Sequence, residues 1–112
     1  MTAVTDEYMQ QMLAKTKEYH IVLLKPGPGA EGHPDIKKLI WEHGRRNFSL
    51  RADGVLPIVC PITAETGVSG IGIFNTSAEE TKHIMNGDPA VQAGIFVYEI
   101  HPCRSFPGDS LP

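Results

Sequence analysis

Residues 68–101 read VSGIGIFNTSAEETKHIMNGDPAVQAGIFVYEIH, and this stretch decides the fold. Its two ends, 68–75 and 95–101, are apolar runs rich in β-branched and aromatic residues, as is typical of strands. Between them, Ser77 is followed three residues later by a glutamate, which is the sequence pattern of a helix capping box. That helix is expected to end at Gly87. The stretch therefore predicts strand, helix, strand.

The preceding half of the chain has the same order. The run HIVLLK at 20–25 is a compact apolar strand candidate, and the Pro/Gly-rich loop 26–33 ends it. A helix is predicted from Pro34 to about Asp53. The run VLPIVCPI at 55–62 is predicted as a strand at an edge or in a distorted position, because of its prolines. Together the two halves predict a ferredoxin-like βαββαβ subunit, an α+β fold with a four-stranded antiparallel sheet.

The two ends of the chain lie outside this pattern. Thr5 can cap a short amphipathic helix, which predicts an N-terminal helical arm at 1–18. The domain itself is expected at 19–102. The proline-rich segment 103–112 is expected to form an extended tail.

The strands predict a homodimer or a higher oligomer. A sheet with helices on one face and water on the other should alternate apolar and polar residues. The runs 20–25 and 95–101 are apolar on both faces, so the bare face would be a large apolar patch. A second copy packed sheet against sheet would cover that patch. The alternative is that the N-terminal helix or the C-terminal tail covers it.

Composition excludes several classes of partner. The formal charge of −3 gives no electrostatic reason to expect nucleic acid or an anionic membrane. No apolar run approaches the roughly 20 residues that span a bilayer, and the N-terminus lacks the apolar core of a secretory signal. Two cysteines, Cys60 and Cys103, are too far apart in sequence for a CxxC site. They are expected to be free thiols in a reducing cytoplasm.

Two residues are candidates for chemistry. His43 shares a helical stripe with apolar residues and so points towards the core, where a polar side chain needs a hydrogen-bond partner. Asp88 precedes a proline and is a good helix N-cap. A carboxylate beside an imidazole fixes its tautomer and raises its basicity, so a His–Asp pair can act as general base and acid. The alternatives are that His43 is a structural residue with its hydrogen bonds satisfied and that Asp88 only caps a helix. Sequence spacing does not show whether the two side chains meet.

Other signals are weaker. Arg46 lies three residues after His43 and could hold a substrate carboxylate, although a solvent-facing charge or a pair with Glu42 is the simpler interpretation. The other histidines lack the spacing of metal-binding motifs, so no metal site is predicted. The glycines of the loop 26–33 do not have phosphate-loop spacing. A flexible loop, able to act as a lid, is the simpler interpretation.

Two segments resemble a known family. HGRRNFSLRADGVLPIVCP at 43–61 and GDPAVQAGIFVYEIHP at 87–102 resemble the two signatures of YciI-like (YCII-related) proteins. The resemblance covers about residues 19–102. It implies a dimeric α+β barrel and places His43 and Asp88 at the family's His–Asp pair, in a pocket near the dimer interface. It also implies proton-transfer or elimination chemistry on small ring-cleavage or lactone-like compounds, without a cofactor.

Three functions stay open. The first is an enzyme for isomerisation or for elimination of halide or water, with His43 and Asp88 catalytic and Arg46 binding substrate. The second is a non-catalytic dimer that binds a small-molecule ligand or serves as an accessory protein. The third is a cofactor-free monooxygenase. The sequence departs from the family in its longer Pro/Gly loop and in Gly44, which weakens a helix by roughly 1 kcal/mol and can make room for a ligand.

Overall fold

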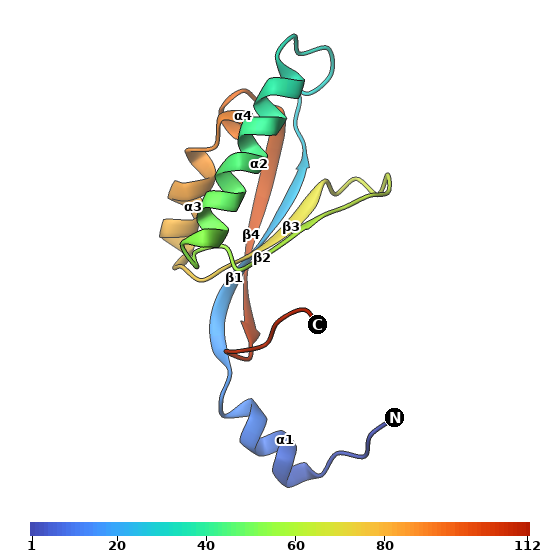
Figure 1. Ribbon diagram of the computed structural model, residues 1–112, viewed down its shortest axis with the longest axis vertical. Coiled ribbons are helices and arrows are strands. Elements are labelled where there is room, and N and C mark those ends of the chain that lie inside the picture. Colours follow the sequence, from blue (N-terminus) through green and yellow to red (C-terminus); the bar gives the residue numbers. More distant parts are fainter.

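A computed structural model describes all 112 residues. The elements follow the order α1 (Asp6–Leu13), β1 (Lys17–Pro26), α2 (Ile36–Ala52), β2 (Ile58–Pro61), β3 (Gly70–Phe74), α3 (Ala78–Asn86), α4 (Pro89–Gln92) and β4 (Phe96–Ser105). Figure 1 shows α2, α3 and α4 on one face of the sheet, with α1 set apart from this body. The predicted ferredoxin-like α+β fold with an extra N-terminal helix is confirmed.

The sheet has the strand order β2-β3-β1-β4, and every neighbouring pair is antiparallel. The central strand β1 pairs with β4 along its whole length, from Lys17 opposite Ser105 to Pro26 opposite Phe96. The short strand β2 stands at the edge, as its prolines predicted.

The strand ends differ from the expected bounds for reasons of backbone pairing. Both β1 and β4 extend beyond the runs 20–25 and 95–101, because polar residues such as Glu18 and Arg104 continue the ladder. The segment expected as a tail therefore begins inside β4. In contrast, β2 is shorter than 55–62, since the N–H groups of Val55 and Leu56 both bind the carbonyl of Leu50 at the end of α2.

Helix ends agree closely with their sequence signals. The Ser77 hydroxyl accepts a hydrogen bond from the N–H of Glu80, and Asp88 caps α4 with Pro89 in its first turn. The exception is α2, which begins after Asp35 and leaves Pro34 in the preceding turn.

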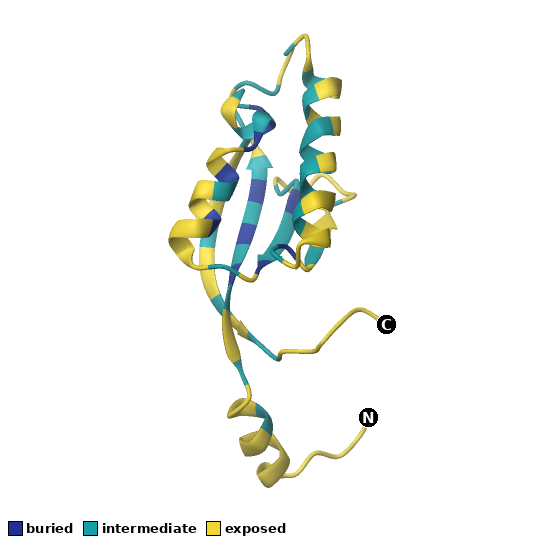
Figure 2. Ribbon diagram, turned by 60° about the vertical axis from the view of Figure 1, so that its left-hand side comes forward, coloured by how far each residue is buried: buried dark blue, intermediate teal, exposed yellow.

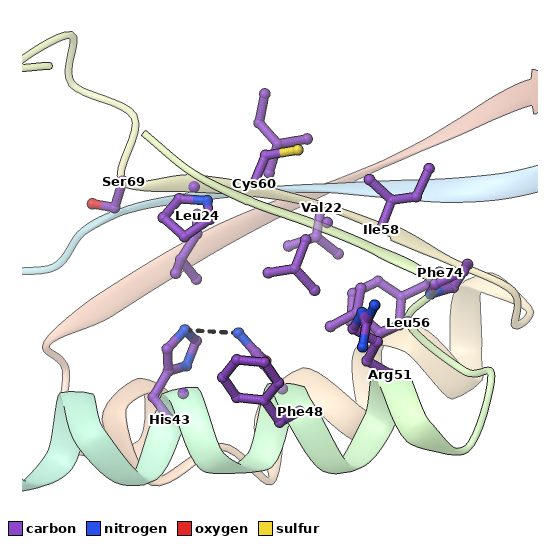
Figure 3. A pocket seen from close by; sticks show the side chains of 18 of the residues that line it. Val22, Leu24, His43, Phe48, Arg51, Leu56, Ile58, Cys60, Ser69 and Phe74 are labelled. Carbon is purple, nitrogen blue, oxygen red and sulfur yellow. Dashed lines mark hydrogen bonds between the residues drawn. The ribbon is translucent and has the colours of Figure 1, made fainter. Parts of the chain in front are cut away.

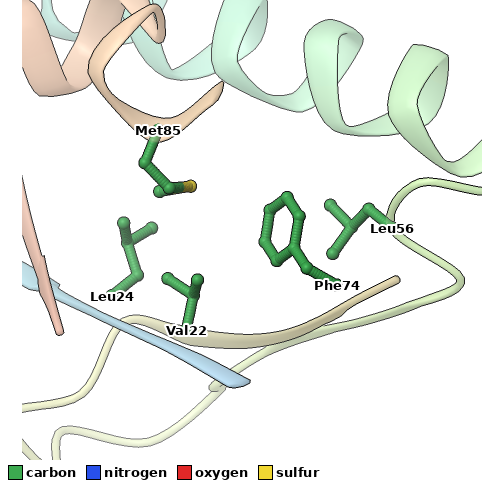
Figure 4. Close-up of a cluster of buried hydrophobic side chains, with 5 residues drawn as sticks. All are labelled: Val22, Leu24, Leu56, Phe74 and Met85. Atoms are coloured by element: carbon green, nitrogen blue, oxygen red, sulfur yellow. The ribbon is translucent and has the colours of Figure 1, made fainter. Parts of the chain in front are cut away.

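The core lies between the sheet and its helices. It consists of five buried side chains, Val22, Leu24, Leu56, Phe74 and Met85, drawn in Figure 4. Helix α2 contributes no buried residue. Figure 2 shows that burial is concentrated in the sheet and in α3 and α4, whereas α1 is exposed on most sides. This thin packing leaves room for a cavity under α2.

The other face of the sheet is uncovered by any helix and carries an apolar row on β1 and β3, whereas β4 adds Glu99 and His101 to the same face. Strand register puts Val22 on the helix-covered face opposite Gly72, so the alternate residues face away. Ile21 pairs there with Ile73, and Leu23 pairs with Ile71.

None of the helices combines the length and apolar character needed to cross a bilayer. Both cysteines are free thiols.

Candidate functional site

His43 lies near the middle of α2 and points towards the start of β4. Its side chain is only 12% exposed, and its Nδ1 lies 2.5 Å from Oδ2 of Asp88. The His43 ring also packs on Phe96, with 5.0 Å between ring centroids and an interplanar angle of 52°. The structure thus brings together two residues that are 45 positions apart in the sequence.

Asp88 divides its carboxylate between two tasks. Oδ1 accepts a hydrogen bond of 2.8 Å from the N–H of Ala90 and so caps α4, while Oδ2 faces His43. The side chain is 1% exposed. Burial by itself raises the pKa of Asp88, but the hydrogen bond and charge of His43, together with the N–H groups of Ala90 and Val91, lower the pKa below its ordinary value of 3.8. Asp88 is therefore an anion held by fixed donors.

This arrangement determines the tautomer of His43. A carboxylate can only accept hydrogen bonds, so Nδ1 of His43 carries the proton and Nε2 of the neutral ring keeps a lone pair. Asn47, one turn later on α2, brings its side-chain nitrogen to 3.2 Å from that Nε2 and donates to it. Both ring nitrogens are therefore held by protein groups in the unliganded chain.

A cavity of about 690 Å³ opens between α2 and the sheet. Figure 3 shows His43, Phe48 and Arg51 rising from α2 towards the sheet, and a dashed line marks the hydrogen bond that Asn47 donates to His43. The lining of the cavity is largely apolar and includes Val22, Leu24, Leu56, Phe74, Met85 and Phe96. The volume and lining suit a small, mainly apolar organic molecule.

Three of the polar residues that line the cavity form a line on α2, while Ser69, Asp109 and Ser110 come from other parts of the chain. His43, Asn47 and Arg51 all line it and stand four residues apart, so they share one helix face. Asn47 and Arg51 were not predicted as site residues, although their spacing from His43 is a signal that could have found them. An arginine at one end of an apolar cavity can hold an anionic group of a ligand.

Arg46 occupies a different place from the one predicted for a substrate-binding residue. Its guanidinium lies against Gly87, where a Cβ would come within 2.8 Å of Nη2, and Arg46 is not among the residues that line the cavity. Its Nη1 is buried and has no hydrogen-bond partner. Arg46 thus packs against Gly87 in the turn between α3 and α4, whereas Arg51 lines the cavity.

The remaining histidines have local partners or face solvent. His20 is buried, and its Nδ1 donates to the carbonyl of Thr76 at 2.8 Å. His33 accepts a hydrogen bond from the N–H of Asp35. No three side chains of His, Cys, Asp or Glu come together as a metal site would require.

The loop after β1 is held to the turn before β4. The N–H of Gly27 binds the carbonyl of Ile95 at 2.7 Å, and the N–H of Gly29 binds the carbonyl of Gly94 at 2.8 Å. A Cβ on Gly27 would lie only 2.2 Å from the Gly94 carbonyl oxygen. These bonds tie residues 27–29 down, so this part of the loop is not the flexible lid that its composition suggested.

Comparison with solved structures finds the same fold in an enzyme. The structure of 5-chloro-2-hydroxyhydroquinone dehydrochlorinase (TftG) from Burkholderia phenoliruptrix AC1100, in complex with 2,5-dihydroxybenzoquinone, superposes with a TM-score of 0.52. The two chains are 17% identical, over 74% of this chain and 90% of that chain. No family model matches the sequence, and no curated protein matches it. At this level of identity the likeness shows the fold, and it confirms the ferredoxin-like α+β subunit.

Proposed function

We propose that this chain is a YciI-like enzyme that uses His43 and Asp88 to move a proton on a small organic substrate bound in the cavity under α2. The observation that carries the proposal is the 2.5 Å contact between Nδ1 of His43 and a buried carboxylate, at the wall of an apolar cavity. Such a pair presents a basic Nε2 to a ligand and stabilises the imidazolium that proton transfer creates.

Elimination or isomerisation is the chemistry that fits this pair. In an elimination, Nε2 of His43 takes a proton from the substrate and the electrons of that C–H bond form a new double bond. The adjacent carbon–chlorine or carbon–oxygen bond breaks, and chloride or hydroxide leaves with the electron pair of that bond. In an isomerisation, the imidazolium returns the proton to another atom of the same molecule. Neither reaction needs a group beyond the pair itself, since the same nitrogen accepts and donates. The fold shared with a dehydrochlorinase supports the first of the two.

Asn47 has to move or exchange partners for this chemistry. Its side-chain nitrogen occupies the Nε2 lone pair, so a substrate hydrogen must displace that contact before proton transfer. The same amide can then donate to an oxygen of the bound substrate. Arg51, further along the same face, would hold an anionic substituent.

The proposal is tested by turnover. Chloride release from 5-chloro-2-hydroxyhydroquinone and deuterium exchange into enolisable ketones and lactones cover the two reactions. His43→Gln should lower the turnover rate by roughly 100-fold or more, which is the contribution that general base catalysis makes. The matched control is His83→Gln on the exposed side of α3, which should retain full activity. Full activity in a folded His43→Gln variant would remove this mechanism.

A non-catalytic ligand-binding protein is the second candidate, and the contact between Asn47 and Nε2 of His43 favours it. A histidine with both ring nitrogens engaged by protein groups can be a structural part of the cavity wall. This candidate predicts that 2,5-dihydroxybenzoquinone raises the melting temperature without being converted. Oxygen consumption with a hydroquinone would instead favour a cofactor-free monooxygenase.

We also propose that the chain forms a homodimer through the open face of its sheet. The support is the apolar row of Ile21, Leu23, Ile71 and Ile73, which no helix covers. Burying such a row in water-free contact with a second copy stabilises the pair by the hydrophobic effect. The two free thiols suit a reducing compartment such as the cytoplasm.

A further inference from the structure

Helix α2 carries an exposed apolar surface next to the cavity. Ile40, Trp41 and Phe48 are 42%, 70% and 71% exposed, and Gly44 lies among them on the same side of the helix. We refer to these four residues as the α2 surface. Ile40, Gly44 and Phe48 also line the cavity, so whatever covers this surface also covers part of the cavity mouth.

Gly44 is the second sign that this surface has an occupant. Glycine within a helix lowers stability by about 1 kcal/mol relative to alanine. Apart from the adjoining residues and backbone of α2 itself, no atom lies within 4 Å of where a Cβ of Gly44 would stand, so packing within the chain does not require a glycine here. A glycine in that position leaves a notch into which a side chain from outside the chain can fit.

Helix α1 has the complementary properties. It has no buried residue, and its exposed apolar side chains Tyr8, Met9 and Leu13 share one face. Its first turn contains Asp6 and Glu7, and its last turn contains no basic residue. In contrast, α2 has four exposed basic residues, Lys37, Lys38, Arg45 and Arg51, against the single acidic residue Glu42, while Arg46 is turned towards Gly87. An acidic amphipathic helix and a basic apolar surface attract each other.

The α1 helix of the same chain falls short of this surface. His43 packs on Phe96, which pairs with Pro26 at the end of β1. Pro26 lies nine residues along the strand from Lys17, so the distance between these two residues is roughly 30 Å. Only residues 14–16 separate α1 from β1, and they span at most roughly 10 Å. The eight residues of α1 add about 12 Å, which leaves the arm too short. Figure 1 shows α1 at the far end of the β1–β4 ribbon.

We propose that the α2 surface is the docking site for the α1 helix of a second copy of this chain. Tyr8, Met9 and Leu13 pack on Trp41 and Phe48, with one apolar side chain in the notch at Gly44. Asp6 and Glu7 lie near the basic residues of α2. Because the relation between two copies is reciprocal, each copy gives one arm and receives one. The arm then closes part of the cavity of its neighbour.

The single tryptophan of the chain reports directly on this contact. Iodide quenching of Trp41 emission, measured on the full chain over a dilution series alongside sedimentation velocity, should show a shielded indole in the assembled protein and an open one after dissociation. The double variant Met9→Lys with Leu13→Lys should restore full quenching and weaken association by about tenfold or more. Gln11→Lys, on the side of α1 turned away from Met9 and Leu13, is the matched control and should leave Trp41 shielded.

Gly44→Ala separates docking from folding. It should fill the notch and weaken association by about tenfold, while the dilute chain becomes more resistant to urea. The lysine variants leave the body intact because α1 has no buried residue. The proposal is overturned if Trp41 is quenched freely at every concentration, which would indicate a different protein or no occupant. It is equally overturned if Trp41 stays shielded in the double variant, which would mean that another segment covers it.

Discussion

Asp88 holds His43 with one carboxylate oxygen and caps α4 with the other. Oδ2 lies 2.5 Å from Nδ1 of His43, and Oδ1 lies 2.8 Å from the N–H of Ala90. The same side chain thus fixes the end of a helix and the orientation of the candidate base. Any change at Asp88 should alter stability and the site together.

Substitutions at Asp88 should separate these two bonds. The amide side chain in Asp88→Asn has a single carbonyl oxygen, which can accept from Ala90 or from His43 but not from both. We expect Asp88→Asn to lower the free energy of unfolding by about 1–2 kcal/mol and Asp88→Ala by roughly twice as much. Urea denaturation measures both values. Asp53→Ala, at an exposed aspartate after α2, should change stability by less than about 0.5 kcal/mol. Equal losses in the two Asp88 variants would contradict the double role.

The pH dependence of stability should show Asp88 at the acidic end. Its pKa is lowered below 3.8 in the folded chain, so the folded state binds the proton less readily than the unfolded state. The stabilisation is complete above the unfolded pKa near 3.8 and is lost as pH falls through the lower folded pKa. Unfolding free energies measured across the acidic range, from near neutral pH to well below that pKa, should therefore fall more steeply in the native chain than in Asp88→Asn. Parallel curves would show that Asp88 carries no such linkage.

Two glycines should respond oppositely to alanine. A Cβ at Gly27 would strike the carbonyl oxygen of Gly94, whereas a Cβ at Gly44 would meet open space. Gly27→Ala should lower the unfolding free energy by about 2 kcal/mol or more, because the loop at 27–29 must move away from the turn at 94–95 to which it is hydrogen-bonded. Gly44→Ala should raise that of the dilute chain by about 0.5–1 kcal/mol. Circular dichroism during urea titration compares the two, and the same sign for both would refute this account of the loop.

The open face of the sheet should govern dimer formation. Ile21→Lys places a charge in the middle of the proposed interface, opposite Ile73, and should weaken dimerisation by about 100-fold. Glu79→Lys, on the exposed side of α3, is a control of similar size and should leave the dimer intact. Sedimentation velocity of both variants measures how strongly each one dimerises. A dimer that survives Ile21→Lys unchanged would have to be formed by another surface.

Much of the fold could be predicted because each element has its own local signal. The capping residues Ser77 and Asp88, the apolar strands and the glycines after helices all act over a few residues. The bounds of β1 and β4 were harder, since polar residues such as Glu18 extend the ladder through backbone pairing alone. The fixed position of residues 27–29 also depends on bonds to a distant turn, which composition does not reveal.

Local signals also explain why the sequence says less about the candidate site. The sequence indicated which face of α2 turns inward, and that selected His43. It did not indicate which flank of that face meets the cavity, because this depends on where the sheet edge and α3 lie. The cavity lies on the flank of Asn47 and Arg51, and Arg46 on the other flank packs against Gly87. A choice between two arginines on the same helix was therefore beyond local reasoning.

The most direct test of the central claim is the tautomer of His43, read from the ¹⁵N shifts of its imidazole at a pH where the ring is neutral. We expect the proton to reside on Nδ1, facing Asp88, and Nε2 to show the shift of an unprotonated nitrogen. In Asp88→Asn this preference should weaken. A proton on Nε2 in the native chain would contradict the account, because that nitrogen could then not accept a proton from a substrate.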